Sequence, residues 1–138
     1  MTAFIDPTRE AFAALKDLPR DHAVEMLNLV RLRDQAVYDD GRIATGAEAY
    51  AAYGRESGPI FKRVGGEIIW SATPEFMVIG PADEAWHVAF VARYPTGQAF
   101  LDMVHDRDYQ AIVFHRQAAV ATSRLIRTKP RESGAGFG

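Results

Sequence analysis

Cysteine is absent from this chain of 138 residues. Its absence excludes disulfides, thiolate metal sites and cysteine nucleophiles together, and it favours a reducing, cytoplasmic setting. Long apolar runs are also missing, since none approaches the roughly 20 residues that a membrane span needs. The first twelve residues show no basic stretch followed by an apolar one. We therefore expect neither a membrane span nor a signal peptide.

An excess of charge of one sign is lacking too. The chain has 16 Lys and Arg against 18 Asp and Glu, which gives a formal net charge of −2. Without a long-range positive field, neither nucleic acid nor an anionic membrane is an expected partner. With 48% hydrophobic and 25% charged residues, the composition is that of an ordinary globular protein. A chain of this length suits one domain with its own hydrophobic core.

Motifs for common cofactors and metals are missing as well. The sequence contains no G-x-G-x-x-G, P-loop or G-x-S-x-G pattern. Its four histidines do not form a pair at the i, i+4 spacing that zinc ligands on a helix show. His105 and His115 are ten residues apart across an expected helix break, while His22 and His87 fall on separate expected strands. We therefore expect no metal and no cofactor.

The apolar and capping residues predict one N-terminal helix followed by strand, helix, strand, strand, helix, strand. Asp6 is the expected cap of the first helix, with Pro7 at its first position. A capping box formed by Thr45 and Glu48 starts the second helix, and Gly58 with Pro59 is expected to interrupt it, by a kink or by the start of a second short helix over 59–64. Strands are expected over 22–32, 67–80 with a bend or break at Pro74, 86–94 and 124–128. Further helices are expected over 97–104 and from Asp106 to about Ser123.

This order is that of the split βαβ, or ferredoxin-like, arrangement in the α+β class. It predicts an antiparallel sheet with both helical segments on one face. The other face needs a cover, and the same face of a second copy is the simplest one, which predicts a homodimer through the open sheet face. The residues available to either face are Ile69, Met77, Val88 and Phe90.

Three parts are expected along the chain. Residues 1–21 form an N-terminal helical extension, and residues 22–128 form the ferredoxin-like domain. Residues 129–138 are rich in glycine and polar residues, which is typical of a flexible tail.

Several short motifs carry a resemblance to a known family. An aromatic-Pro-Thr step, an Asp-x-x-Tyr-Gln step and a final Ser-Arg-Leu surround a lone arginine. Upstream lie a Tyr-x-x-Tyr pair, a proline and a Gly-Gly pair. The residues concerned are Tyr94, Pro95, Thr96, Asp106, Tyr109, Gln110, Arg116, Ser123, Arg124 and Leu125, with Tyr50, Tyr53, Pro59, Gly65 and Gly66 upstream. Over roughly residues 22–127 the sequence resembles the bacterial family called domain of unknown function 1330.

That resemblance implies a dimeric α+β barrel but no assigned chemistry. The fold is similar to that of the superfamily holding cofactor-free monooxygenases, muconolactone isomerases and haem-dependent chlorite dismutases, whose members place ligands between the sheet and the helices. The chain departs from simpler family members by residues 1–21 and by an insertion at residues 33–46. Both additions are expected to reshape or cover the mouth of a pocket.

Arg116 is the first candidate site residue. On a continuous helix at about 100° per residue, it shares one apolar face with Tyr109 and Ser123, whose hydroxyls are further candidates. A buried guanidinium needs a partner. That partner is either structural, for example Glu25, Glu67 or backbone carbonyls, or an anionic ligand in the cavity between helix and sheet. His115 falls about 100° off this face, so we expect it at the surface or at an interface.

Three other residues are ligand-binding candidates, each with a structural alternative. Arg93 ends the clearest strand, where a salt bridge at the rim is the alternative. Asn28 interrupts the apolar pattern of the first strand, and a satisfied core amide is the alternative. His87 has the pKa range of an acid or base, and a half-buried strand histidine is the alternative.

Two functions follow from these residues. The first is a homodimer that binds a small polar or anionic metabolite between sheet and helices, as a cofactor-independent enzyme of monooxygenase or isomerase type. The alternative is a non-catalytic dimeric binding or interaction module whose core is filled with side chains. No catalytic residue can be assigned from the sequence.

Overall fold

The computed structural model describes residues 3–132, 134 and 136–137. Its strands are β1 (Val24–Leu32), β2 (Glu67–Ala72), β3 (Val88–Tyr94) and β4 (Val120–Thr128). Its helices are α1 (Arg9–Asp17), α2 (Gly46–Arg63), α3 (Gly97–His105), α4 (Arg107–Ile112) and α5 (Phe114–Ala119).

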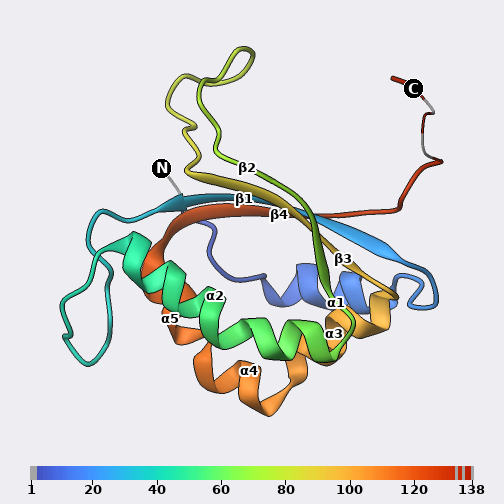
Figure 1. The fold of residues 1–138 in the computed structure, drawn as a ribbon, viewed down its shortest axis with the longest axis horizontal. Coiled ribbons are helices and arrows are strands. Elements are labelled where there is room, and N and C mark those ends of the chain that lie inside the picture. Colours follow the sequence, from blue (N-terminus) through green and yellow to red (C-terminus); the bar gives the residue numbers. More distant parts are fainter. Residues whose placement is uncertain (1–2, 133, 135, 138) are drawn as a thin grey trace.

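The four strands form one antiparallel sheet in the order β2-β3-β1-β4. β1 is a central strand because it pairs with both β3 and β4. The connection from β1 to β2 runs through α2, and the connection from β3 to β4 runs through α3, α4 and α5. Figure 1 shows the helices together on one side of the sheet. The α+β, ferredoxin-like prediction is therefore confirmed.

Strand register decides which side chains meet the helices. Val24 lies opposite Tyr94, and Val30 lies opposite Val88, so these four side chains share the helix-facing side of the sheet. Val24 and Val30 are each 1% exposed. Burying a valine of this kind contributes roughly 1.5–3 kcal/mol. The buried core on this side comprises Val24, Met26, Ile60, Ala92, Tyr94, Ala99 and Met103 in one cluster and Val30, Ala49, Ala119 and Val120 in another.

No helix of the described residues covers the opposite sheet face (Figure 1). Because side chains alternate along a strand, Leu27 and Leu29 of β1 and Val91 of β3 point to this face. Trp70, which lies opposite Val91, is 51% exposed. Val88 and Phe90, which were expected to be available to either face, instead pack against the helix-side core.

Helix α2 begins at the predicted capping box, in which Thr45 and Glu48 each accept a backbone N–H bond from the other. A second short helix starting at Pro59 does not form, because α2 continues through the proline to Arg63. Pro59 lies on the exposed side of the last turns, where water can satisfy the carbonyl that loses its donor. Ser57 and Ile60 on the buried side keep those turns packed on the sheet.

Two other element boundaries differ from the expectation. Helix α1 begins at Arg9 with Thr8 as its cap, not Asp6. Thr8 accepts the backbone N–H of Ala11, so the proline at position 7 lies just before the helix. β2 ends at Ala72, and residues 73–87 form a connection that rises from the open side of the sheet (Figure 1).

The long helix expected from Asp106 to Ser123 is also wrong. It is divided at Val113, which ends α4 and precedes α5, and α5 ends at Ala119. β4 then starts at Val120, opposite Leu32 across a register shift in β1. Val120 is fully buried in this pairing, so strand contacts override the helical pattern of the preceding residues.

The N-terminal extension packs along the domain. Ser123 donates its backbone N–H to the Phe4 carbonyl, and Phe12 of α1 meets the His105 ring edge-on at 5.7 Å. The expected tail, residues 129–138, includes residues 133, 135 and 138, which lie outside the described residues. Its flexibility stays a prediction.

Candidate functional site

Arg116 lies on the short helix α5, and its side chain is only 16% exposed. Its guanidinium donates to the Ile5 carbonyl at 2.6 Å and to the Ser123 hydroxyl at 3.2 Å. Within the described ranges, the nearest carboxylate is that of Asp6, at 3.9 Å. Of the structural partners considered for this arginine, a backbone carbonyl is the one observed. Neither Glu25 nor Glu67 pairs with it.

The N-terminal segment, residues 3–6, covers Arg116 from the edge of β4. Ser123 donates from both its backbone N–H and its hydroxyl to the Phe4 carbonyl, each at 2.8 Å. The Ser123 hydroxyl also accepts from Arg116, so one buried group joins the strand, the helix and the segment. The site around Arg116 is therefore closed by residues outside the ferredoxin-like core.

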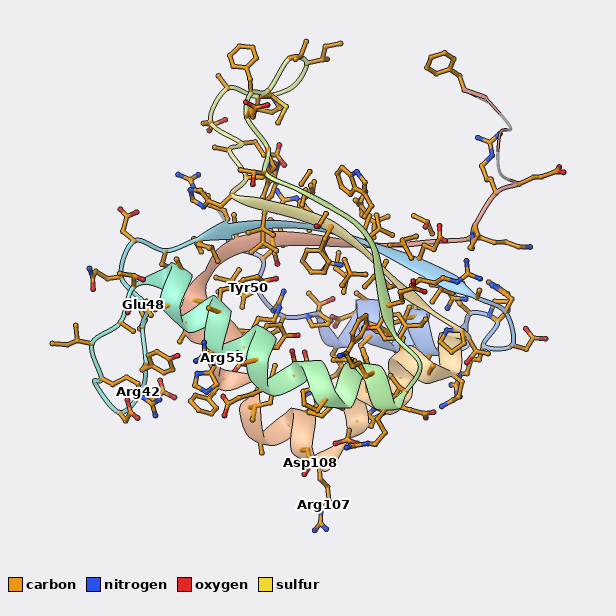
Figure 2. All side chains as sticks on the ribbon, viewed as in Figure 1. Arg42, Glu48, Tyr50, Arg55, Arg107 and Asp108 are labelled. Carbon is orange, nitrogen blue, oxygen red and sulfur yellow. The ribbon has the colours of Figure 1, made fainter. Side chains whose placement is uncertain are left out.

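Tyr50 and Tyr53 lie near enough to Arg116 for its charge to act on them, and Tyr109 contacts Tyr53. We name these four residues the tyrosine–arginine cluster. Tyr50 and Tyr53 come from α2, and Tyr109 comes from α4. The hydroxyls of Tyr53 and Tyr109 are 2.8 Å apart, and the rings of Tyr50 and Tyr53 are 5.7 Å apart. Tyr50 also packs against the core cluster around Val30, on the helix side of the sheet (Figure 2).

Burial determines the protonation state of these tyrosines. It raises the pKa of Tyr50 to about 12, against the opposing charge of Arg116. It holds the pKa of Tyr53 well above 10, with a smaller contribution from neighbouring Tyr109. Both hydroxyls are therefore neutral near pH 7. A neutral phenol can donate a hydrogen bond to an oxygen atom, but it does not act as a base there.

The six predicted site residues fall on two sides of the sheet. Arg116 and Ser123 are hydrogen-bonded on the helix side, where Tyr109 contacts Tyr53 of α2. Asn28, opposite Phe90, faces the same side, where its amide donates to the carbonyl of Met26 at 3.0 Å.

Arg93 and His87 do not join them. Arg93 points to the open face and pairs with Glu25 at 3.3 Å, which is the rim salt bridge considered from the sequence. His87 is exposed, not half-buried, at the far end of β1, where its Nδ1 accepts the backbone N–H of Leu32 at 2.9 Å.

The expectation for His115 is wrong, because its side chain is only 9% exposed. The division of the helix at Val113 resets the phase of the residues that follow, which turns His115 inward. Its Nε2 lies 2.5 Å from a Glu56 carboxylate oxygen, and its Nδ1 lies 2.7 Å from the Tyr38 hydroxyl. In the neutral ring, Nε2–H donates to Glu56 and Nδ1 accepts from Tyr38.

This chain of carboxylate, imidazole and hydroxyl was missed from the sequence. Arg42 lies over the Tyr38 ring at 4.6 Å, and partial burial raises the pKa of Tyr38. Tyr38 therefore keeps its proton and can donate to His115. This hydrogen bond holds the inserted loop at residues 33–46 against α5, and His115 in turn contacts Glu56 of α2. No pattern of spacing links Tyr38, Glu56 and His115, so only the folded chain could reveal them.

In the described part of the chain, no three of the His, Asp and Glu side chains gather in a way that could hold a metal ion. Within the same residues, no helix combines the length and hydropathy that a bilayer crossing needs.

The chain is similar to one protein family and to two solved structures over most of its length. A family model described as domain of unknown function (DUF1330) matches residues 43–128. A crystal structure of methylated RPA0582 protein is 54% identical, with a TM-score of 0.94 over 97% of this chain and 99% of that one. A second structure of RPA0582, a protein of unknown function from Rhodopseudomonas palustris, is 53% identical, with a TM-score of 0.91 over 95% and 99%.

More distant structures share the fold alone. SnoaB, a cofactor-independent oxygenase from Streptomyces nogalater, is 14% identical, with a TM-score of 0.54 over 83% of this chain and 98% of that one. A dimeric protein of unknown function with a ferredoxin-like fold from Bacteroides fragilis is 10% identical, with a TM-score of 0.50 over 78% and 95%. No curated protein matches the chain.

Proposed function

Because the chain belongs to the family described as domain of unknown function DUF1330, its activity must be argued from its own side chains, and we propose that it binds a small anionic or polar metabolite at Arg116. In this proposal the chain works as a homodimer, with one such site in each subunit between the sheet and the helices.

The charge of Arg116 is the observation that carries the proposal. Its side chain is largely removed from water, yet the two groups that accept its hydrogen bonds among the described residues, the Ile5 carbonyl and the Ser123 hydroxyl, are neutral. The Asp6 carboxylate at 3.9 Å is exposed and lies at the limit of an ion pair. A guanidinium has five N–H donors in a planar fork that matches a carboxylate or a phosphate. An anion would therefore be a better partner than the present carbonyl.

The tyrosines supply the rest of the recognition. Tyr53 and Tyr109 share one hydrogen bond between their hydroxyls, which leaves one O–H free to donate to a ligand. Because the pKa of Tyr50 is raised to about 12, its hydroxyl is a donor as well. Neutral donors beside a guanidinium favour a ligand with several oxygen acceptors, such as a hydroxylated aromatic acid.

The N-terminal segment is the expected gate. Residues 3–6 hold Arg116 through the Ile5 carbonyl and are themselves held by Ser123. A ligand carboxylate that bound Arg116 would replace that carbonyl, so the segment would move when the ligand enters.

The test uses isothermal titration calorimetry with 4-hydroxybenzoate, which carries a carboxylate and a phenol. We expect saturable binding to the wild type and a loss of at least about tenfold in affinity for Arg116→Met, since a charge-assisted pair is removed. Arg107→Met is the matched control, because Arg107 on α4 projects into solvent (Figure 2). Deletion of residues 1–6 should tighten binding. An absence of heat from the wild type, or equal affinity of Arg116→Met, would refute the assignment.

The homodimer rests on the open sheet face. Leu27, Leu29 and Val91 point to it, and Trp70 is half exposed there. An apolar sheet face of this kind is typical of an interface. A structural relative of the same fold is described as dimeric, which supports the same arrangement here.

Sedimentation velocity tests the dimer. A glutamate at position 27 would bring two like charges together across a two-fold axis, so Leu27→Glu should sediment as a monomer at micromolar concentration. Ile43→Glu is the control, because Ile43 is 94% exposed in the inserted loop. A wild-type monomer, or a dimer that survives Leu27→Glu, would contradict the proposal.

Two uses of the bound metabolite remain candidates. A monooxygenase or isomerase reaction without cofactor is one, in which the cluster would stabilise an oxyanion in the bound substrate. A non-catalytic module is the other. It is favoured by the close packing beneath α1, where a gap beside Val24, Phe100 and Arg127 is too narrow for water. Oxygen consumption with bound 4-hydroxybenzoate tests the monooxygenase: uptake supports it, and its absence counts against it. An isomerase takes up no oxygen, so chromatography of the bound compound for an isomeric product separates the isomerase from the module, which forms none.

A further inference from the structure

A second feature with the chemistry of a binding site lies away from the tyrosine–arginine cluster. A hollow of about 400 Å³ opens at the end of the sheet where β1 ends and β4 begins. Its polar lining comes from Arg31, Arg33, Asp34, His87 and Thr122. Thr122 lies opposite Arg31 in the sheet, and its neighbour Ser123 points to the other face, towards Arg116. The hollow and the cluster are therefore separate.

Hydrogen bonds that already exist leave donors directed to whatever enters this hollow. The backbone N–H of Leu32 donates to His87 Nδ1 at 2.9 Å, so the neutral ring carries its proton on Nε2. The Thr122 hydroxyl oxygen accepts the N–H of Phe4 at 3.0 Å, which leaves the Thr122 O–H as a donor. Both side chains are thus set to donate.

The two arginines of the lining lack a charge partner. Among the described residues, no carboxylate lies within ion-pair distance of Arg31 or Arg33. In the same part of the chain, Nε of Arg33 is the one buried side-chain nitrogen or oxygen without a hydrogen-bond partner. Such a group is costly, so the Arg33 side chain would gain by turning to an acceptor in the hollow.

We propose that this hollow is an anion site for a small carboxylate or phosphate, which Arg31 and Arg33 bind while His87 Nε2–H and the Thr122 O–H orient it. Four of the five polar lining residues are donors, and Asp34 is the exception. The Asp34 carboxylate would accept from a hydroxyl or ammonium group on the same ligand. The volume lies in the range of pockets for small metabolites.

The site is tested by titrating the full-length protein with inorganic phosphate and with benzoate while following backbone amide resonances. Sodium chloride at matched ionic strength is the reference. We expect saturable shifts at Leu32 and Thr122, which neighbour the donors, with millimolar affinity or tighter. Arg33→Gln should weaken binding by about tenfold or more because a charge-assisted bond is lost. Arg31→Gln gives the same test if Arg33→Gln does not fold.

Arg55→Gln is the matched control, because Arg55 is an exposed arginine on α2, on the helix side of the sheet (Figure 2). Shifts from phosphate alone, benzoate alone or both would each support the site and identify the preferred anion. Shifts that chloride reproduces, or that Arg33→Gln leaves unchanged, would mean an adventitious ion only and overturn the proposal. Because Arg116→Met is expected to spare these shifts, failure here is distinguishable from failure of the Arg116 site.

Discussion

Replacing Arg116 with methionine tests the candidate residue whose hydrogen bonds link α5 to the N-terminal segment and to β4. Methionine retains most of the apolar stem but removes the hydrogen bonds of 2.6 Å to Ile5 and 3.2 Å to Ser123. A bond from a charged donor contributes roughly 1.5–3 kcal/mol, and relief of charge burial offsets part of the loss. We expect Arg116→Met to lower the free energy of unfolding by about 2 kcal/mol, the net of these opposing effects.

Urea denaturation followed by circular dichroism measures this loss, at one fixed protein concentration because a dimer's stability depends on it. Arg107→Met is the control and should change stability by less than about 0.5 kcal/mol, as exposed substitutions usually do. Deletion of residues 1–6 removes the Ile5 carbonyl. Because both changes remove the same contact, the destabilisation of the double variant should be about 1 kcal/mol smaller than the sum of the two single effects. A neutral or stabilising Arg116→Met would refute the reasoning, because it would mean that the arginine is merely tolerated.

Three further outcomes are expected. Folding raises the pKa of Tyr50 to about 12. Its contribution to the free energy of unfolding is therefore fully present below pH 10, and it declines by up to about 3 kcal/mol as pH rises towards 12. Urea midpoints between pH 8 and 11 measure this, and a flat profile contradicts it. Tyr38→Phe leaves Nδ1 of buried His115 unpaired, so it should cost about 1–2 kcal/mol and speed amide exchange in the inserted loop; unchanged exchange would show that the contact does not fasten the loop. A Cβ at Gly46 would lie 1.8 Å from a backbone oxygen, whereas one at Gly54 meets nothing within 4 Å. Gly46→Ala should therefore unfold or severely destabilise the protein, while Gly54→Ala should stabilise it by about 0.5–1 kcal/mol in thermal denaturation; equal effects would refute the steric argument.

The candidate site shows where sequence reasoning succeeded and failed. Arg116 and Ser123 meet, although the continuous helix used to group them does not exist, whereas Tyr109 contacts Tyr53. Arg116 faces inward from α5, while Ser123 reaches it from β4. His115 was placed at the surface because the same helix was assumed, and the break at Val113 turned it inward.

The sequence by itself determined the order of the elements and hence the fold. Apolar periodicity, the capping box at Thr45 and the turn residues act over a few neighbours, so they can be read without knowing the tertiary structure. The tertiary structure decided what each polar side chain meets. The partner of Arg116 is 111 residues away at Ile5, and that of His115 is 77 residues away at Tyr38. Such contacts depend on strand register and on where helices end, and local propensities do not set them.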